Sequence, residues 1–165
     1  MYEYVGAIHI HSVYSDGTGK IEDIAKAAYD SDLDFIMMTD HNTLKPKEDG
    51  FEKWMNSVMV IIGYEVNDMN NKNHYLAFGL DEVIGDYQVL DSGELGSKLP
   101  AKEYVKQIKD KGGIGFLAHP DEDLAGRVHR AGRPPLTAVD DVVVAVGADP
   151  GGDVGGVRGG DVRLG

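Results

Sequence analysis

Short apolar runs alternate with amphipathic helical patterns through residues 1–120, and several of the runs end in histidine, aspartate or glutamate. This alternation predicts an α/β fold with mainly parallel strands. Strands buried on both faces have continuous apolar sequences, as in Phe35–Met38 and Val60–Ile62. The polar residues then fall at the carboxyl ends of the strands, where parallel α/β folds and barrels carry their active sites.

The elements follow from periodicity and from turn residues. We predict strands at 4–11, 33–39, 58–64, 74–80 and 114–119 and helices at 20–30 and 100–111, with a further helix expected at 51–55. In the first helix, four apolar residues follow the i, i+3, i+4, i+7 spacing of one buried face: Ile21, Ile24, Ala25 and Ala28. The second begins at Pro100 and ends before Gly112 and Gly113.

Composition changes abruptly after Pro120. Residues 1–120 contain 11 Lys and no Arg, whereas residues 121–165 contain 5 Arg and no Lys, with 10 Gly and 9 Val. We therefore divide the chain into residues 1–120 and a low-complexity Gly/Val/Arg-rich tail, residues 121–165, in which only 139–146 could form a strand. The tail could be a natural extension, a frameshifted or chimeric join, or a second domain. We favour the join, because the tail's residues mostly have G- and C-rich codons.

Charge and composition exclude several functional classes. The net charge of −12 argues against a stable nucleic-acid coat, which needs clustered Lys and Arg. It does not exclude a phosphorylated substrate, because bound cations reverse the local sign. The chain has no cysteine, so disulfides and thiolate metal sites are excluded. It shows no signal peptide and no apolar run of roughly 18 residues, so we expect a cytoplasmic protein without membrane contact.

Two histidines two residues apart end the first predicted strand. His9 and His11 should point to the same face of a strand, where two imidazoles could bind one cation or two adjacent ones. Alone, the pair could equally lie on an exposed strand face.

The other candidates also have ordinary explanations when each is taken singly. Asp16 precedes a glycine in a turn, Asp40 or Asn42 could cap a helix or turn, and Glu65 could mark a strand emerging into water. His74 could be a surface histidine and His119 a satisfied buried one. The order and spacing of the whole set favour a shared metal site.

That order resembles the PHP (polymerase and histidinol phosphatase) superfamily across residues 1–120. Its four motifs are similar to residues 9–17, Thr39-Asp40-His41, Gly63-Tyr64-Glu65 with His74, and Ala118-His119-Pro120. The resemblance implies an α/β fold, a distorted (β/α)7 barrel that is incomplete here. It also implies two or three divalent metal ions held by His9, His11, Asp16, His41, Glu65, His74 and His119.

The resemblance further implies metal-dependent hydrolysis of phosphoesters by metal-activated water. The catalytic candidates are Asp16, His41 and Glu65, and the substrate would be a phosphorylated small molecule, a nucleotide or a short oligonucleotide. Independently of the resemblance, imidazole and carboxylate donors together suit Mn, Zn or Fe. Asp40 is expected to orient a ligand, through a hydrogen bond to a ligand histidine, rather than to bind a cation.

The sequence departs from the family pattern in one respect. Relatives supply a last Asp-x-His pair that is absent here, so the chain holds seven of nine expected ligands and should bind at least one metal weakly. A catalytically inactive metal-binding fragment and an accessory module of a larger protein are therefore alternatives. The first motif's position at residue 9 favours a free-standing enzyme. An unclosed barrel should also expose apolar strand edges.

Overall fold

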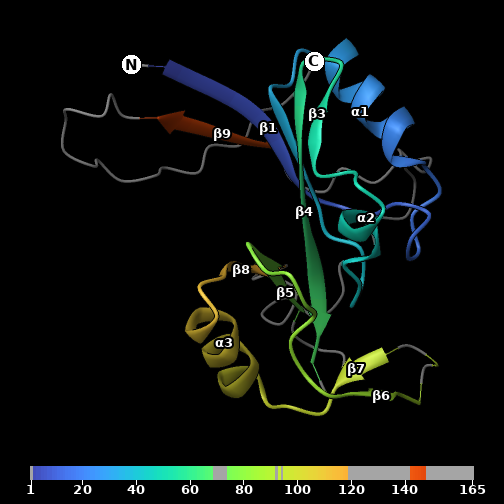
Figure 1. The fold of residues 1–165 in the computed structure, drawn as a ribbon, viewed down its shortest axis with the longest axis vertical. Helices are drawn as coiled ribbons and strands as arrows, with labels where there is room; N and C mark the ends of the chain where they lie inside the picture. The colour runs from blue at the N-terminus through green and yellow to red at the C-terminus, as the bar shows by residue number, and fades with distance from the viewer. Residues whose placement is uncertain (1, 69–73, 92, 94, 119–141, 148–165) are drawn as a thin grey trace, which may run out of the picture.

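The computed structural model describes residues 2–68, 74–91, 93, 95–118 and 142–147, and its main feature is one curled, mixed sheet (Figure 1). The sheet has strand order β8-β5-β4-β2-β1-β9, with β3 paired to the first part of β4. Its strands are β1 (Tyr2–Ile10), β2 (Phe35–Met38), β3 (Lys53–Met55), β4 (Val58–Asn67), β5 (His74–Phe78), β8 (Ile114–Ala118) and β9 (Val142–Gly147).

Few further elements accompany the sheet. They are the two-stranded sheet of β6 (Tyr87–Val89) and β7 (Leu95–Ser97) and the helices α1 (Ile21–Asp30), α2 (Lys45–Glu48) and α3 (Ala101–Asp110). Figure 1 shows the main sheet curling as an open half-barrel, which confirms the predicted α/β class and partial barrel. The division at residue 120 stays a prediction, because 119–141 and 148–165 lie outside the described residues.

Three parallel strands form the centre of the sheet as predicted. β1 pairs with β2, from Gly6 opposite Phe35 to Ile10 opposite Met38. β2 pairs with β4, and there Met38 lies opposite Ile62. The carboxyl ends of β1, β2 and β4 therefore meet at one edge of the sheet.

The prediction of mainly parallel strands is wrong for the rest of the sheet. β5 is antiparallel to both β4 and β8, and β9 is antiparallel to β1. Residues 68–73 between β4 and β5 are too few for the crossover of a dozen or more residues that a parallel pair needs. As a result, β5 begins at the edge where β4 ends.

The helix expected at 51–55 is also wrong, because residues 53–55 form β3. β3 turns directly into β4 through Asn56 and Ser57, which have φ angles of 49° and 68°. Two successive positive φ angles are the signature of a two-residue type I′ hairpin turn, and this geometry joins antiparallel strands.

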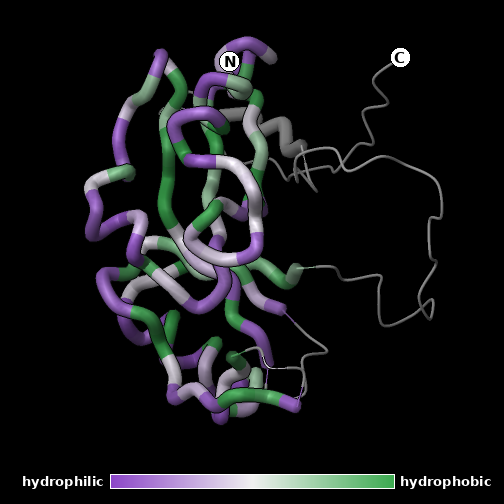
Figure 2. Tube along the Cα trace, turned by 90° about the vertical axis from the view of Figure 1, so that its right-hand side faces the viewer, coloured by the Kyte–Doolittle hydropathy of each residue, from purple (hydrophilic) through white to green (hydrophobic). Residues whose placement is uncertain are grey.

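The core lies between one face of the parallel strands and α1. Ile21, Ala25 and Ala28 of α1 are buried, as the helical spacing predicted, and Ile36 and Val60 are 1% and 0% exposed. Figure 2 shows long hydrophobic stretches along the strands and hydrophilic turns between them. Burial of this face fixes the orientation of β1, β2 and β4, and with it the positions of the residues at their carboxyl ends.

The expectation of exposed apolar strand edges agrees with β8, the last described strand on its side of the sheet. Ile114, Phe116 and Leu117 are 60%, 45% and 56% exposed. Within the described residues, no helix has the length and apolar character needed to cross a membrane.

Truncation of the buried Ile36 to alanine should lower the free energy of unfolding by roughly 2–5 kcal/mol, because the side chain leaves a cavity under α1. Trp54→Ala on β3 is the control, since Trp54 is 68% exposed and its loss should change stability by no more than about 0.5 kcal/mol. Urea unfolding of both variants measures the difference. Equal effects would contradict this placement of the core.

Candidate metal centre

The parallel register extends past the strands and brings His41 beside Glu65. The two residues form a parallel bridge, Asn42 N–H donates to Glu65 O at 2.9 Å, and Glu65 N–H donates to Asp40 O at 3.2 Å. Met38 and Ile62 are paired in the ladder, so residues three positions later stay in step. The shared carboxyl edge predicted from the sequence is therefore present.

His9 reaches the site through a β-bulge rather than through simple alternation. The register between β1 and β2 shifts between Ile8 and Ile10, and His9 between them has a φ of 75°. His9 and Ile10 are consecutive yet both buried, at 1% and 2% exposure. The bulge sends Ile10 into the core and His9 toward Glu65, and a positive φ in a non-glycine residue stores backbone strain.

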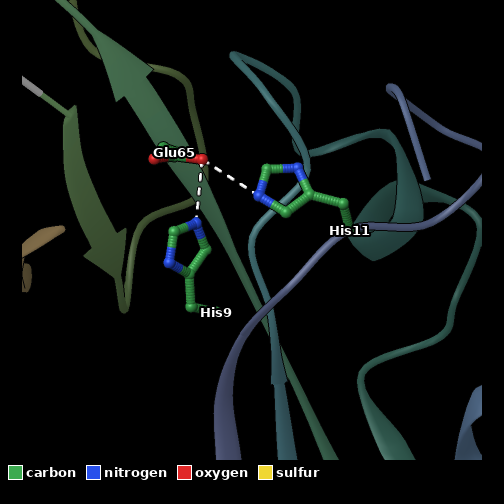
Figure 3. A group of neighbouring side chains, drawn as sticks. All are labelled: His9, His11 and Glu65. Carbon is green, nitrogen blue, oxygen red and sulfur yellow. Dashed lines mark hydrogen bonds and ion pairs between the residues drawn. The ribbon is translucent and has the colours of Figure 1, made fainter. Parts of the chain in front are cut away.

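Glu65 is the point on which the imidazoles converge (Figure 3). Its Oε2 lies 3.0 Å from His9 Nε2 and 3.0 Å from His11 Nε2. Its Oε1 lies 2.8 Å from His74 Nδ1, and His41 Nδ1 is 3.5 Å from Oε2. The carboxylate is 1% exposed, so four histidines from three separate segments surround a buried acid.

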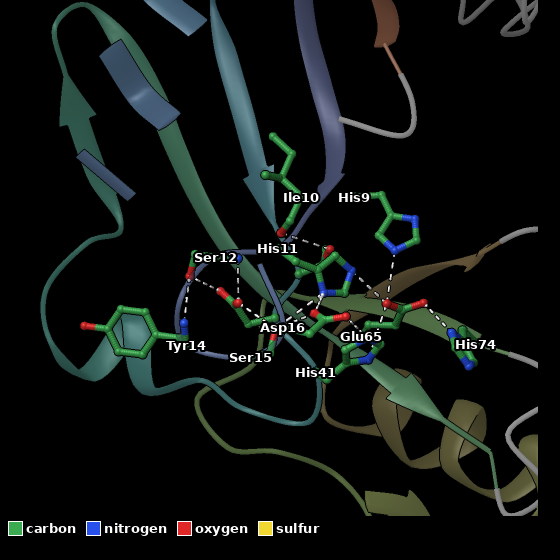
Figure 4. Close-up of polar contacts among 12 residues, drawn as sticks. His9, Ile10, His11, Ser12, Tyr14, Ser15, Asp16, His41, Glu65 and His74 are labelled. Carbon is green, nitrogen blue, oxygen red and sulfur yellow. Dashed lines mark hydrogen bonds and ion pairs between the residues drawn. The ribbon is translucent and has the colours of Figure 1, made fainter. Parts of the chain in front are cut away.

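A second group lies on the solvent side of the first. Asp16 Oδ1 is 3.0 Å from His11 Nδ1, and Asp16 Oδ2 is 3.6 Å from His41 Nε2 (Figure 4). Asp16 is 68% exposed and His41 is 24% exposed. His11 thus faces Glu65 with one ring nitrogen and Asp16 with the other.

These side chains form two overlapping groups that could each hold a metal ion. One consists of His9, His11 and Glu65, and the other of His11, Asp16 and His41, with the donor atoms of each group within 4.8 Å of one another. Within the described part of the chain, the ion pairs of Glu65 and Asp16 are with histidines and with no Lys or Arg.

The electrostatics of the centre follow from burial and from these contacts. Burial raises the pKa of Glu65, but hydrogen bonds with His11, His74 and His9 outweigh it and hold that pKa far below its usual range. Burial lowers the pKa of His11, but the hydrogen bond with Glu65 leaves it raised overall. Burial leaves the pKa of His41 lowered.

The exposed acid of the centre is also shifted. Partial burial raises the pKa of Asp16, but the nearby charges of His11 and His41 outweigh this effect. The pKa of Asp16 is therefore lowered overall. Both carboxylates are therefore held ionised at neutral pH, which is the form that binds a cation.

Asn67 is a site residue that the sequence analysis missed. Its Oδ1 lies 2.8 Å from His41 Nδ1, and Asn67 is 3% exposed. A hydrogen bond donated by Nδ1–H to this oxygen fixes the tautomer of His41 and leaves Nε2, the nitrogen facing Asp16, as the ligand atom. Asn67 follows Glu65 by two residues in β4, so strand alternation could have placed both on one face.

The expected hydrogen bond from Asp40 to a ligand histidine is not among its contacts. Asp40 is 0% exposed and accepts from Ser12 N–H at 2.7 Å, Ser12 Oγ–H at 2.8 Å and Ser15 Oγ–H at 2.8 Å. Its contacts go to the turn that carries Asp16. Nothing in the spacing of Ser12 or Ser15 indicated this role.

His119 lies outside the described residues, although Ala118 before it pairs with His74 in the sheet. Lys45 and Lys47, the lysines after the Thr-Asp-His motif, bind elsewhere: Lys45 Nζ is 2.7 Å from Asp49 Oδ1 and Lys47 Nζ is 2.9 Å from Leu80 O.

The donor set fits divalent cations. Imidazole nitrogens and carboxylate oxygens are the ligands that Zn, Mn and Fe prefer. A buried carboxylate such as that of Glu65, which is 1% exposed, requires positive partners, and the described ones are imidazoles that also bind metals when neutral. His9, His11, Asp16, His41 and Glu65 could therefore hold one cation in each group.

The family model described as PHP domain matches residues 7–118. No curated protein matches the chain.

Two solved structures of bacterial proteins are similar to parts of the chain. A candidate metal-dependent phosphoesterase from Bifidobacterium adolescentis is 26% identical, with a TM-score of 0.41 over 46% of this chain and 28% of its own. A two-domain protein from Bacteroides vulgatus, containing a predicted PHP-like metal-dependent phosphoesterase, is 22% identical, with a TM-score of 0.47 over 70% of this chain and 34% of its own. The chain thus spans about a third or less of either protein.

Because His9 lies in a bulge with a positive φ, the protein should be more stable with glycine at position 9 than with alanine. Both substitutions remove the imidazole, but only glycine adopts a φ of 75° without steric cost. His9→Gly should therefore exceed His9→Ala in free energy of unfolding by roughly 1 kcal/mol when measured with a chelator present. A more stable alanine variant would show that the bulge does not exist.

The low pKa of Glu65 and the raised pKa of His11 predict a stability window. Glu65 contributes stability above its unfolded pKa of 4.5 and loses it as pH falls, whereas His11 contributes below 6.5 and loses it as pH rises. In chelator, the loss of stability caused by Glu65→Gln should be largest between these values. Urea unfolding from pH 3 to 9 tests this, with Glu103→Gln on the exposed face of α3 as control, and a pH-independent difference would contradict it.

Proposed function

The chain belongs to the PHP domain family, and we propose that it provides a two-cation centre for the hydrolysis of phosphoesters. The observation that carries this proposal is the buried carboxylate of Glu65 met by imidazole nitrogens of His9, His11 and His74 at 2.8–3.0 Å. Protein metal centres that hydrolyse phosphoesters combine these donors at the carboxyl ends of strands.

The residues divide between the two cations. His9, His11 and Glu65 would hold the inner one, and His11, Asp16 and His41 the outer one. Glu65, whose two oxygens face different histidines, could bridge them, with His74 and the sequence-predicted His119 completing the set. Bound divalent cations would supply the charge that stabilises a phosphoryl transition state and would acidify water at neutral pH.

Exposure indicates the side from which a substrate approaches. Glu65 and His9 are each 1% exposed, so they hold a cation without meeting solvent. Asp16 and His41 are 68% and 24% exposed and line the open side. Among the catalytic candidates, Asp16 and His41 would face the phosphoryl group while Glu65 fixes the cations behind it.

The proposed substrate is a phosphorylated small molecule, a nucleotide or a short oligonucleotide. The described lysines nearest the Thr-Asp-His motif are paired with Asp49 and Asp81, so phosphate recognition would rest on the cations. A cation-based site suits a small substrate whose phosphate enters the open side. Mn, Zn and Fe all suit the donors, and we propose two or three ions of this group.

The chain should release p-nitrophenol from p-nitrophenyl phosphate or bis(p-nitrophenyl) phosphate in the presence of Mn²⁺ and not in chelator. His9→Ala should reduce the rate by about 100-fold or more, since it removes a ligand of the inner cation. Trp54→Ala, on an exposed part of β3, should leave the rate unchanged. Release that survives His9→Ala would contradict the proposal, and Mn²⁺ binding without turnover would support the inactive metal-binding alternative.

A further inference from the structure

Asp40 is a fully buried acid whose side-chain hydrogen bonds go to Ser12 and Ser15 and not to the candidate ligands. Its carboxylate accepts hydrogen bonds from Ser12 N–H, Ser12 Oγ–H and Ser15 Oγ–H at 2.7, 2.8 and 2.8 Å. Asp40 and Ser12 are both 0% exposed. A buried carboxylate with three charge-assisted hydrogen bonds is a strong anchor, because no water competes for its oxygens.

The anchored segment is a tight turn folded back on His11. Ser15 N–H donates to Ser12 O at 3.1 Å, and Tyr14 N–H donates to Ser12 Oγ at 3.2 Å. At Gly17 a β-carbon would lie 2.3 Å from His11 O, so the turn packs directly against the backbone of a ligand. This packing leaves the turn little freedom to move.

Asp16 depends on this turn for its position. It is 68% exposed, so burial does not hold its side chain against His11 and His41. Ser15 Oγ lies 3.2 Å from Asp16 Oδ1 and 3.4 Å from His11 Nδ1. The hydroxyl that Asp40 holds is therefore also in contact with the outer group of ligands.

The sheet does not need Asp40 to join β1 to β2. The two strands are paired from Gly6 opposite Phe35 to Ile10 opposite Met38, and Thr39 N–H donates to Ile10 O at 2.8 Å. The side-chain hydrogen bonds of Asp40 all go to Ser12 and Ser15, beyond this ladder. They order the turn rather than the strands.

We propose that Asp40 is a positioning residue that sets the cation affinity of the outer group, His11, Asp16 and His41, by holding the turn through Ser12 and Ser15. The inner group of His9, His11 and Glu65 should depend on it less, because His9 and Glu65 lie within β1 and β4, and only His11, which both groups share, adjoins the turn. This inference rests on the proposed function only in so far as the two groups bind cations.

Calorimetric titration of the full chain with Mn²⁺ tests the proposal. Asp40→Ala should weaken one class of Mn²⁺ site by about 10–100-fold and weaken the other much less. Asp40→Asn keeps one acceptor oxygen and should lose less. Of the three hydrogen bonds to Asp40, Ser15→Ala removes only the one from Ser15, and it should weaken the same class of Mn²⁺ site. This variant tests the proposal if Asp40→Ala fails to fold.

A matched control comes from the other end of β2. Asp34 Oδ2 accepts a hydrogen bond from Val5 N–H at 2.8 Å. Like the bonds of Asp40, this bond joins an aspartate next to β2 to the β1 segment, but it lies far from the turn. Asp34→Ala should leave both Mn²⁺ affinities unchanged. An equal loss in Asp34→Ala would show that Asp40 acts through general stability and would overturn the proposal.

A double-mutant cycle separates positioning from a merely structural role. In an Asp16→Ala background, Asp40→Ala should cause no further loss of Mn²⁺ affinity, because its effect passes through Asp16. Additive losses, equal weakening of both classes of site, or unchanged affinity in Asp40→Ala and Ser15→Ala would each overturn the inference. Intact Mn²⁺ binding without phosphate release would contradict the proposed function and leave this inference standing.

Discussion

Glu65 lies near the carboxyl end of β4, and its carboxylate is only 1% exposed. Ring nitrogens of three histidines lie 2.8–3.0 Å from the oxygens of that carboxylate. A buried charge is tolerated only when partners replace the lost water. His9, His11 and His74 are such partners, and they come from segments far apart in the sequence. The contacts therefore depend on β1, β4 and β5 meeting at one edge, and the curl of the sheet around that edge gives the site its enclosed inner side and its open outer side.

Backbone constraints concentrate where the ligands lie. His9 has a φ of 75° in a bulge, and Asn42, next to His41, has a φ of 52°. Strained or irregular backbone persists where surrounding structure determines it, and it clusters at functional sites. Here the parallel ladder of β1, β2 and β4 supplies the rigid frame, and the irregular residues aim side chains from that frame toward Glu65.

The sequence predicted which histidines and acids lie together better than it predicted the strand directions. Histidines and acids at the ends of apolar runs were recognisable because parallel strands end together, and His41 and Glu65 do lie side by side. The hairpin at Asn56 and Ser57 was missed because its signal is only two residues long, and residues 51–55 before it were assigned to a helix. The antiparallel direction of β5 follows from the short connection between β4 and β5, residues 68–73, and the sequence analysis did not use the length of that connection.

The residues that support the candidate ligands were harder to predict than the candidate ligands themselves. Asn67 shares strand alternation with Glu65, so its place beside His41 was accessible from the sequence. The bulge at His9 and the bonds of Asp40 to Ser12 and Ser15 arise from tertiary packing, which periodicity does not encode.

The central claim is that the two ligand groups bind cations. Anomalous diffraction from Mn²⁺-soaked crystals tests it most directly: the account predicts one peak in each group, and peaks confined to exposed acids elsewhere would contradict it.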